Sequence, residues 1–226
     1  QNAVLSRLDE EECSQFEDTA AMRSLLDSGA VQLVSARWLV QHCAAGAVLP
    51  RRQELEKDNP EAIMKVVPWD IPFGRFYSQD GSHPLVQPVV AISYAWLSPT
   101  HPDPQGLQWQ LVAAELRDDM QRHSLDDVGV FWDWVSIHQK DADGRRTRRE
   151  QHLFDRALES MAVWYAHRAT RVMLVTQSFD AKVKYMERGW PLFERCCAQV
   201  FKPQFFVAST QVGNGTQRPD MIMECG

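Results

Sequence analysis

The sequence lacks several features that would place it in a well-marked class. No run approaches about 18 apolar residues, so we expect no membrane-spanning helix and no membrane partner. The net charge is −6, which argues against a dedicated nucleic-acid-binding surface. The five cysteines show no repeating spacing, which favours reduced thiols over a zinc knuckle or a disulfide framework. We therefore expect a soluble cytoplasmic protein.

Common catalytic motifs are also missing. There is no glycine-rich phosphate loop of the GxxxxGK(S/T) or GxGxxG type, no GxSxG elbow, and no HExxH pair. These absences lower the expectation for a P-loop enzyme, a serine hydrolase or a zinc protease. The chain starts at Gln1 and stops at Gly226, which is typical of a piece cut from a longer protein.

Residues 1–87 predict a small helical N-terminal region followed by a connector. Ser35 is a candidate N-cap for the second of two helices, and Gly46 follows its expected end. Four prolines and little periodicity in residues 51–87 predict an extended segment that packs on its neighbour. The aromatic and aliphatic residues expected to make that contact are Trp69, Ile71, Phe73 and Phe76.

Residues 88–226 show a different pattern, in which short apolar runs alternate with amphipathic segments. Strands are predicted at 89–92, 128–131, 171–175 and 205–207, with helices at 106–122, at 150–166 and from 191 onward. Such alternation favours an α/β domain with a parallel sheet and helices on both faces. Ligands in such sheets bind beyond the carboxyl ends of the strands.

Three segments fall at this edge and contain the candidate site residues. Ser93 and Tyr94 end the first strand, and Asp133 directly follows the second. Asp133 could bind a ribose hydroxyl, or it could fix the loop through an Asx turn. Glu194 could simply complement the positive end of its helix, which would favour its ionised form, or it could be a catalytic acid beside Trp190.

Four segments, in their order along the chain, resemble the fungal heterokaryon-incompatibility (HET) domain. That family shows a strand ending in ISY and followed by W, a segment like WIDAICINQ, a helix ending near IY..A..V, and a late RGWT.QE. The related Toll/interleukin receptor (TIR) domain has a similar first strand, an acidic residue after the second strand, and a late W…E pair with the same spacing. The matching segments are Ile92-Ser-Tyr-Ala-Trp96, Phe131–Gln139, Met161–Tyr165 with Ala169 and Arg171-Val172, and Arg188–Glu194.

The resemblance covers residues 88–208 and departs from the families at two points. Pro191-Leu-Phe stands where HET domains have Thr-x-Gln, and a clear fifth strand of the TIR fold is missing. It implies a flavodoxin-like, TIR-like fold that cleaves the nicotinamide–ribose bond of NAD, with Glu194 as the catalytic carboxylate. It also implies NAD as substrate, neither metal nor resident cofactor, and a homo-oligomer. Ser93, Tyr94, Trp96, Asp133 and Trp134 would line the pocket, with Trp190 or Trp134 as an aromatic wall.

Two other functions stay open. TIR-like domains also act as non-enzymatic modules that self-associate through the loop after the second strand. Here that loop is 138–149, whose arginines at 145–149 could meet an acidic partner or simply be solvated. A nucleoside deoxyribosyltransferase-like enzyme would share the fold and the glutamate but would transfer the sugar to a second base.

Overall fold

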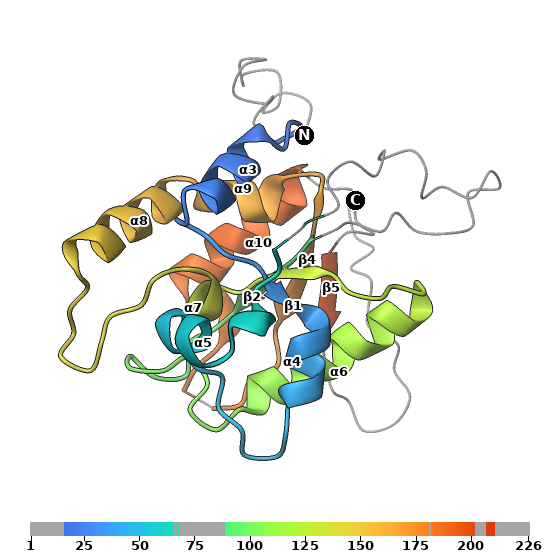
Figure 1. The fold of residues 1–226 in the computed structure, drawn as a ribbon. Coiled ribbons are helices and arrows are strands. Elements are labelled where there is room, and N and C mark those ends of the chain that lie inside the picture. Colours follow the sequence, from blue (N-terminus) through green and yellow to red (C-terminus); the bar gives the residue numbers. More distant parts are fainter. Residues whose placement is uncertain (1–15, 66, 68–88, 181, 202–206, 211–226) are drawn as a thin grey trace.

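Helices and strands alternate along the chain from residue 89 onward, as the sequence predicts (Figure 1). The computed structural model describes residues 16–65, 67, 89–180, 182–201 and 207–210. Its elements are α3 (Ala20–Asp27), β1 (Val34–Ser35), α4 (Ala36–His42), α5 (Arg52–Asp58), η1 (Pro60–Ala62), β2 (Val89–Tyr94), α6 (Leu107–Arg122), β3 (Gly129–Phe131), α7 (Asp133–Ser136), α8 (Arg148–Glu159), α9 (Met161–Ala166), β4 (Thr170–Val175), η2 (Tyr185–Glu187), α10 (Gly189–Phe201) and β5 (Val207–Thr210).

The described strands form one sheet in the order β1-β3-β2-β4-β5. Strands β2, β3, β4 and β5 are parallel, which confirms the predicted parallel sheet, whereas β1 runs antiparallel to β3. The chain passes from β2 to β3 on one side and then crosses to β4 on the other side. A reversal of this kind opens a crevice at the carboxyl ends of the strands, and the order of the parallel strands is compatible with a flavodoxin-like fold.

Alternate residues of β2 point to opposite faces of the sheet, and helices cover both faces (Figure 1). Val90 and Ile92 pack with α4 and α6 on one face. Val89 and Ala91 pack with α3, α9 and residues of α10 on the other. The same alternation turns Ser93 and Tyr94, at the end of the strand, toward different faces.

The N-terminal region contributes to the same sheet and the same core. Strand β1 pairs with β3 through Val34 and Val130, and Ser35 caps α4 by accepting a hydrogen bond from the Trp38 N–H at 3.0 Å. The carbonyl of Leu49 accepts a hydrogen bond from the Trp134 indole at 2.9 Å. Side chains from both sides of residue 87 therefore share one core. The boundary itself lies outside the described residues.

The prediction of an extended connector over 51–87 is wrong for its first part, because α5 and η1 occupy residues 52–62. Helix α5 forms despite the nearby prolines because Glu54 accepts a hydrogen bond from the Arg51 N–H and pairs with its guanidinium, and Leu55 is fully buried. Pro60 then starts η1, a position that proline favours. The predicted contacts of Trp69, Ile71, Phe73 and Phe76 lie outside the described residues.

The single helix predicted over 150–166 is instead two helices, α8 and α9, which meet at Ser160. The Ser160 backbone is not helical (φ −109°, ψ 17°), so the chain changes direction there. This lets α9 bury Trp164 and Tyr165 against the sheet while α8 stays largely at the surface. The late helix begins at Gly189 rather than at Pro191. The last predicted strand is described from Val207, as β5, and residues 205 and 206 of the prediction lie outside the described residues.

Candidate functional site

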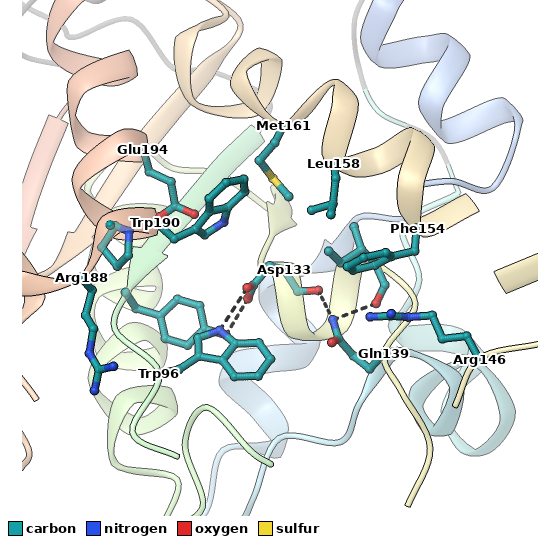
Figure 2. Close-up of a pocket in the computed structure, with 14 residues that line it drawn as sticks. Trp96, Asp133, Gln139, Arg146, Phe154, Leu158, Met161, Arg188, Trp190 and Glu194 are labelled. Carbon is teal, nitrogen blue, oxygen red and sulfur yellow. Dashed lines mark hydrogen bonds between the residues drawn. The ribbon is translucent and has the colours of Figure 1, made fainter. Parts of the chain in front are cut away.

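A pocket of about 420 Å³ opens at the carboxyl ends of β2 and β3, beside the point between β2 and β4 where the strand order reverses (Figure 2). This volume lies within the range of about 300–1,000 Å³ that is usual for small-molecule sites. The pocket is bounded by the end of β2, the segment after β3, one side of α8 and α9, and the start of α10. Its lining residues are Tyr94, Trp96, Asp133, Ile137, Gln139, Arg146, Phe154, Leu158, Met161, Arg188, Gly189, Trp190, Pro191 and Glu194.

Glu194 is the deepest charged residue of the pocket. Only 3% of its surface is exposed, and its Oε2 accepts a hydrogen bond of 2.6 Å from the Ser93 hydroxyl. Tyr165, on α9, is a second hydrogen-bond partner of the side chain. Among the described residues no lysine, arginine or histidine pairs with this carboxyl. Glu194 is therefore a buried acid without a compensating cation.

Burial raises the pKa of Glu194 to about 8, and the negative charge of Asp133 adds to this effect. The hydrogen bonds from Ser93 and Tyr165 lower the pKa but do not offset burial. The sequence predicted the opposite, an acid kept ionised by the start of its helix. That prediction fails because burial of the carboxyl dominates its pKa. In addition, α10 begins two residues earlier, so Glu194 sits in its second turn, where the end of the dipole acts weakly.

Asp133 is held in a dense set of hydrogen bonds beside the pocket. Its Oδ1 accepts from the Tyr94 hydroxyl at 2.5 Å and from the Trp134 N–H at 2.6 Å, and its Oδ2 accepts from the Trp96 indole at 3.1 Å. Burial raises its pKa, and these hydrogen bonds oppose the shift. The bond to the Trp134 N–H goes to the next residue and not to the residue two further on, so it is not the Asx turn that the sequence offered as one alternative, although it does tie Asp133 to the start of α7. Asp133 also lines the pocket, so the structural role leaves contact with a ligand open.

Aromatic and cationic side chains complete the walls (Figure 2). Trp190 is 45% exposed and its ring stacks with that of Phe193, with centroids 5.4 Å apart. On the opposite side, the Arg146 guanidinium lies 3.5 Å from the centre of the Phe154 ring and donates a hydrogen bond to the His138 carbonyl. Arg188 lines the pocket next to Trp190. The site thus combines buried acids with aromatic surfaces and two guanidinium groups.

The structure brings most of the predicted site residues together. Tyr94, Trp96, Asp133, Trp190 and Glu194 all line the pocket. Ser93 does not line it but lies behind Glu194, fully buried. Trp134 is not among the lining residues either, because its indole points to the Leu49 carbonyl and its ring packs edge-on against Trp96.

Several residues of the site were missed by reasoning from the sequence. Phe154, Leu158 and Met161 lie at helical spacing within the helix predicted over 150–166, and periodicity cannot tell a buried core from a pocket wall. Gln139 holds the segment after α7 by donating to the carbonyls of Asp133 and Ile137. Tyr185 lies in η2, between the predicted strand at 171–175 and the late helix, and no local pattern marks it.

The loop over 138–149 is more ordered than a solvated arginine cluster would be. Thr147 caps α8 by accepting from the Glu150 N–H, and Glu150 accepts in return from the Thr147 N–H, at 3.2 and 2.7 Å. Arg146 is engaged with Phe154 and the His138 carbonyl. His138 lies in this loop and is itself buried.

Other features of the described residues bear on the candidate chemistry. Cys43, Cys196 and Cys197 are free thiols, whereas Cys13 and Cys225 lie outside the described part of the chain. Within the residues that the structure describes, no group of three His, Cys, Asp or Glu side chains is arranged to hold a metal ion. In the same residues, no helix has the length and apolar character needed to cross a membrane.

Comparison with known proteins gives no assignment. No protein-family model, no curated protein and no solved structure matches the chain. The candidate site therefore depends on its own geometry.

Proposed function

We propose that the protein is a TIR-like or HET-like domain that cleaves the bond between nicotinamide and ribose in NAD, as many TIR domains do, with Glu194 as the catalytic carboxyl. The observation that carries the proposal is the position of Glu194. It is a buried acid without a cationic partner among the described residues, and it lines the same pocket as the ends of β2 and β3. Strongly perturbed acids in clefts are typical of catalytic sites.

The charges of the pocket suit a cationic ring joined to a phosphate-bearing tail. The nicotinamide ring of NAD is a cation, and a cation near Glu194 and Asp133 would stabilise their ionised forms. Trp190 and Trp96 offer aromatic faces on which such a ring can stack. Arg146 and Arg188 lie toward the two sides of the pocket, where guanidinium groups can pair with the pyrophosphate (Figure 2).

The reaction follows from the same placement. Nicotinamide leaves with the electron pair of the bond between its nitrogen and ribose C1′, which cancels the charge of the ring. The sugar becomes oxocarbenium-like, and the ionised Glu194 stabilises this charge. Water then adds to C1′ and passes its proton to Glu194, giving ADP-ribose. Entry of the cationic substrate would favour loss of the Glu194 proton beforehand, since the carboxyl is largely protonated near neutral pH in the free protein.

The test is nicotinamide release from NAD by the full chain. Glu194→Gln keeps the size of the side chain and its hydrogen bond from Ser93, and we expect it to lower the rate at least about 100-fold. The matched control is Glu187→Gln, a nearby acid whose side chain is 64% exposed and which does not line the pocket. Equal rates for Glu194→Gln and the unaltered protein would remove the enzyme proposal.

A second candidate function is supported by the outer face of α10. Trp190, Leu192, Phe193 and Val200 are large apolar side chains at the surface of this helix, each at least 39% exposed, and Met186 of η2 is also exposed. Clustered exposed apolar residues are typical of protein contacts. A non-enzymatic module that self-associates through this face would form oligomers that Phe193→Asp and Val200→Asp disrupt. Sedimentation of the full chain measures this without reference to NAD.

A further inference from the structure

A chain of hydrogen bonds runs behind Glu194, on the side away from the pocket. Ser93 Oγ lies 2.6 Å from Glu194 Oε2 and 2.6 Å from the hydroxyl of Tyr185. The Tyr185 hydroxyl lies 3.2 Å from the carbonyl of Pro191. All four residues are buried, and neither Ser93 nor Tyr185 lines the pocket. Two hydroxyl groups therefore link the carboxyl to a backbone acceptor in the first turn of α10.

Counting protons gives this chain two complete states. When Glu194 is ionised, Ser93 donates to it and Tyr185 donates to Ser93. When Glu194 is protonated, it can donate to Ser93, which then donates to Tyr185, which donates to the Pro191 carbonyl. Each hydroxyl has one proton and can also accept, so Glu194, Ser93 and Tyr185 each have a hydrogen-bond partner in both states, and the Pro191 carbonyl receives the Tyr185 proton only when Glu194 is protonated.

We propose that Ser93 and Tyr185 are positioning residues, which hold Glu194 Oε2 in one place in both protonation states by reversing the direction of the hydrogen-bond chain. A buried carboxyl that changes protonation without such partners would leave a polar group unsatisfied, and the side chain would move to find another. The chain removes the need for that movement. Only the catalytic meaning of this inference rests on the proposed function, in which Glu194 must exist in both states during one turnover.

Other titratable groups also face Glu194, and their effects on its titration must be distinguished from the effect of the hydrogen-bond chain. Asp133 is the second carboxyl of the pocket, and its charge raises the Glu194 pKa. Tyr165 is hydrogen-bonded to Glu194 from α9, and Arg188 lines the same pocket. Within the described part of the chain, the other titratable groups that act on Glu194 or Tyr185 or share their pocket are Tyr94, Asp133, Tyr165, Arg188, Arg195, Cys196 and Cys197. Among these groups and the two they surround, only Glu194 and Tyr185 are hydrogen-bonded to the Ser93 hydroxyl.

The test follows two carbon signals of the whole polypeptide by NMR as pH varies, without NAD. In the unaltered protein the Tyr185 ring carbon that carries the hydroxyl should shift with the same midpoint as the Glu194 carboxyl carbon. Ser93→Ala interrupts the chain, so the Tyr185 signal should lose this inflection. The same substitution removes a donor to the carboxylate, so the Glu194 midpoint should rise by at least about half a pH unit.

A matched control separates this effect from general damage to the core. Ser136 is also fully buried, and its hydroxyl accepts from the Trp132 N–H at 2.9 Å without contacting the chain. Ser136→Ala should leave both midpoints unchanged. The proposal is overturned if Tyr185 still follows Glu194 in Ser93→Ala, or if Ser136→Ala has the same effect.

Tyr185→Phe keeps the test decisive should Ser93→Ala fail to fold. It removes one hydroxyl without changing the ring, and it takes away the partner of Ser93 on the side away from Glu194. A Glu194 midpoint that stays where it is in the unaltered protein would contradict the proposal. If Tyr185 and Glu194 titrate together as expected but the protein releases no nicotinamide from NAD, the result would contradict only the proposed function.

Discussion

Two buried acids at opposite ends of the sheet behave in opposite ways. Asp119, on α6, is 6% exposed and pairs with Arg171, near the amino end of β4, and with His123. Its hydrogen bonds to His123 and Arg171 and their charges outweigh burial and lower its pKa to about 2. Glu194, at the carboxyl ends of the strands, is 3% exposed and has a pKa raised to about 8. Two similarly buried acids therefore have pKa shifts of opposite sign, and the presence or absence of a cationic partner decides the sign.

The difference separates a structural acid from a candidate functional one. Asp119 has its charge neutralised in place, so it holds α6 against β4 and needs nothing further. Glu194 is bonded to hydroxyl groups only, and it lines a pocket that a charged ligand can enter. A buried acid left without a cation costs stability, and such a cost is usual at sites that bind or react.

The largest expected effect on stability comes from breaking the paired acid. Asp119→Asn leaves the Arg171 charge buried without its partner, and we expect unfolding free energy to fall by about 3–5 kcal/mol. Urea denaturation measures this loss. The pairing in the unaltered protein is complete above the ordinary aspartate pKa of 3.8 and is lost as pH falls toward 2. As a control, Glu187→Gln breaks the exposed pair with Lys184 and should leave stability unchanged.

An effect of the opposite sign, and of similar size at pH 8, is expected from Glu194→Gln. The folded pKa of about 8 lies above the ordinary value of 4.5, so the folded protein keeps a proton that the unfolded chain releases. Stability from this group is fully present below pH 4.5 and is lost as pH rises to 8, at about 1.4 kcal/mol per pH unit. Glu194→Gln removes that slope. Melting temperatures of the two proteins should therefore converge at pH 5, with the variant more stable at pH 8.

The smallest effect is expected at the rim of the pocket. Trp190→Ala removes a ring that is 45% exposed, and the change in unfolding free energy should be below about 1 kcal/mol. If Trp190 is a wall for the nicotinamide ring, the same variant should raise the KM for NAD. Phe193→Ala is the matched control, because Phe193 is 41% exposed and stacks on Trp190 but does not line the pocket. Equal changes in KM for both variants would assign the effect to the patch as a whole.

Much of the sheet could be predicted from local patterns. The runs at Val89 and Arg171 are short, apolar and flanked by breakers, and both became buried parallel strands. Strand β1 could not be predicted because it has two residues, and only its pairing with β3 makes it a strand. Helix α5 was missed because prolines on its far side outweighed its charged, helix-favouring residues, and the buried anchor Leu55 cannot be recognised without the fold.

The candidate site was predictable where it follows from strand ends. Tyr94 and Asp133 lie at the tips of neighbouring parallel strands, so the topology alone brings them together. The meeting of Ser93 with Glu194, separated by 101 residues, needed the resemblance to known families as well. The pKa of Glu194 could not be anticipated, since it depends on how deeply α10 buries the carboxyl. Tyr185 reaches Ser93 through the tertiary packing of η2, which no spacing of residues in the sequence predicts.

Strand β1 has a practical consequence for anyone who shortens this protein. It pairs with β3. Without β1, β3 would be the edge strand of the sheet and would present unpaired N–H and C=O groups. Uncovered strands of this kind pair with other chains and aggregate. A truncated version that starts at residue 88, where the family-like segments begin, would lose this cover together with the Leu49 carbonyl that receives the Trp134 indole. Insolubility of such a fragment would then report a missing strand and would say nothing about its chemistry.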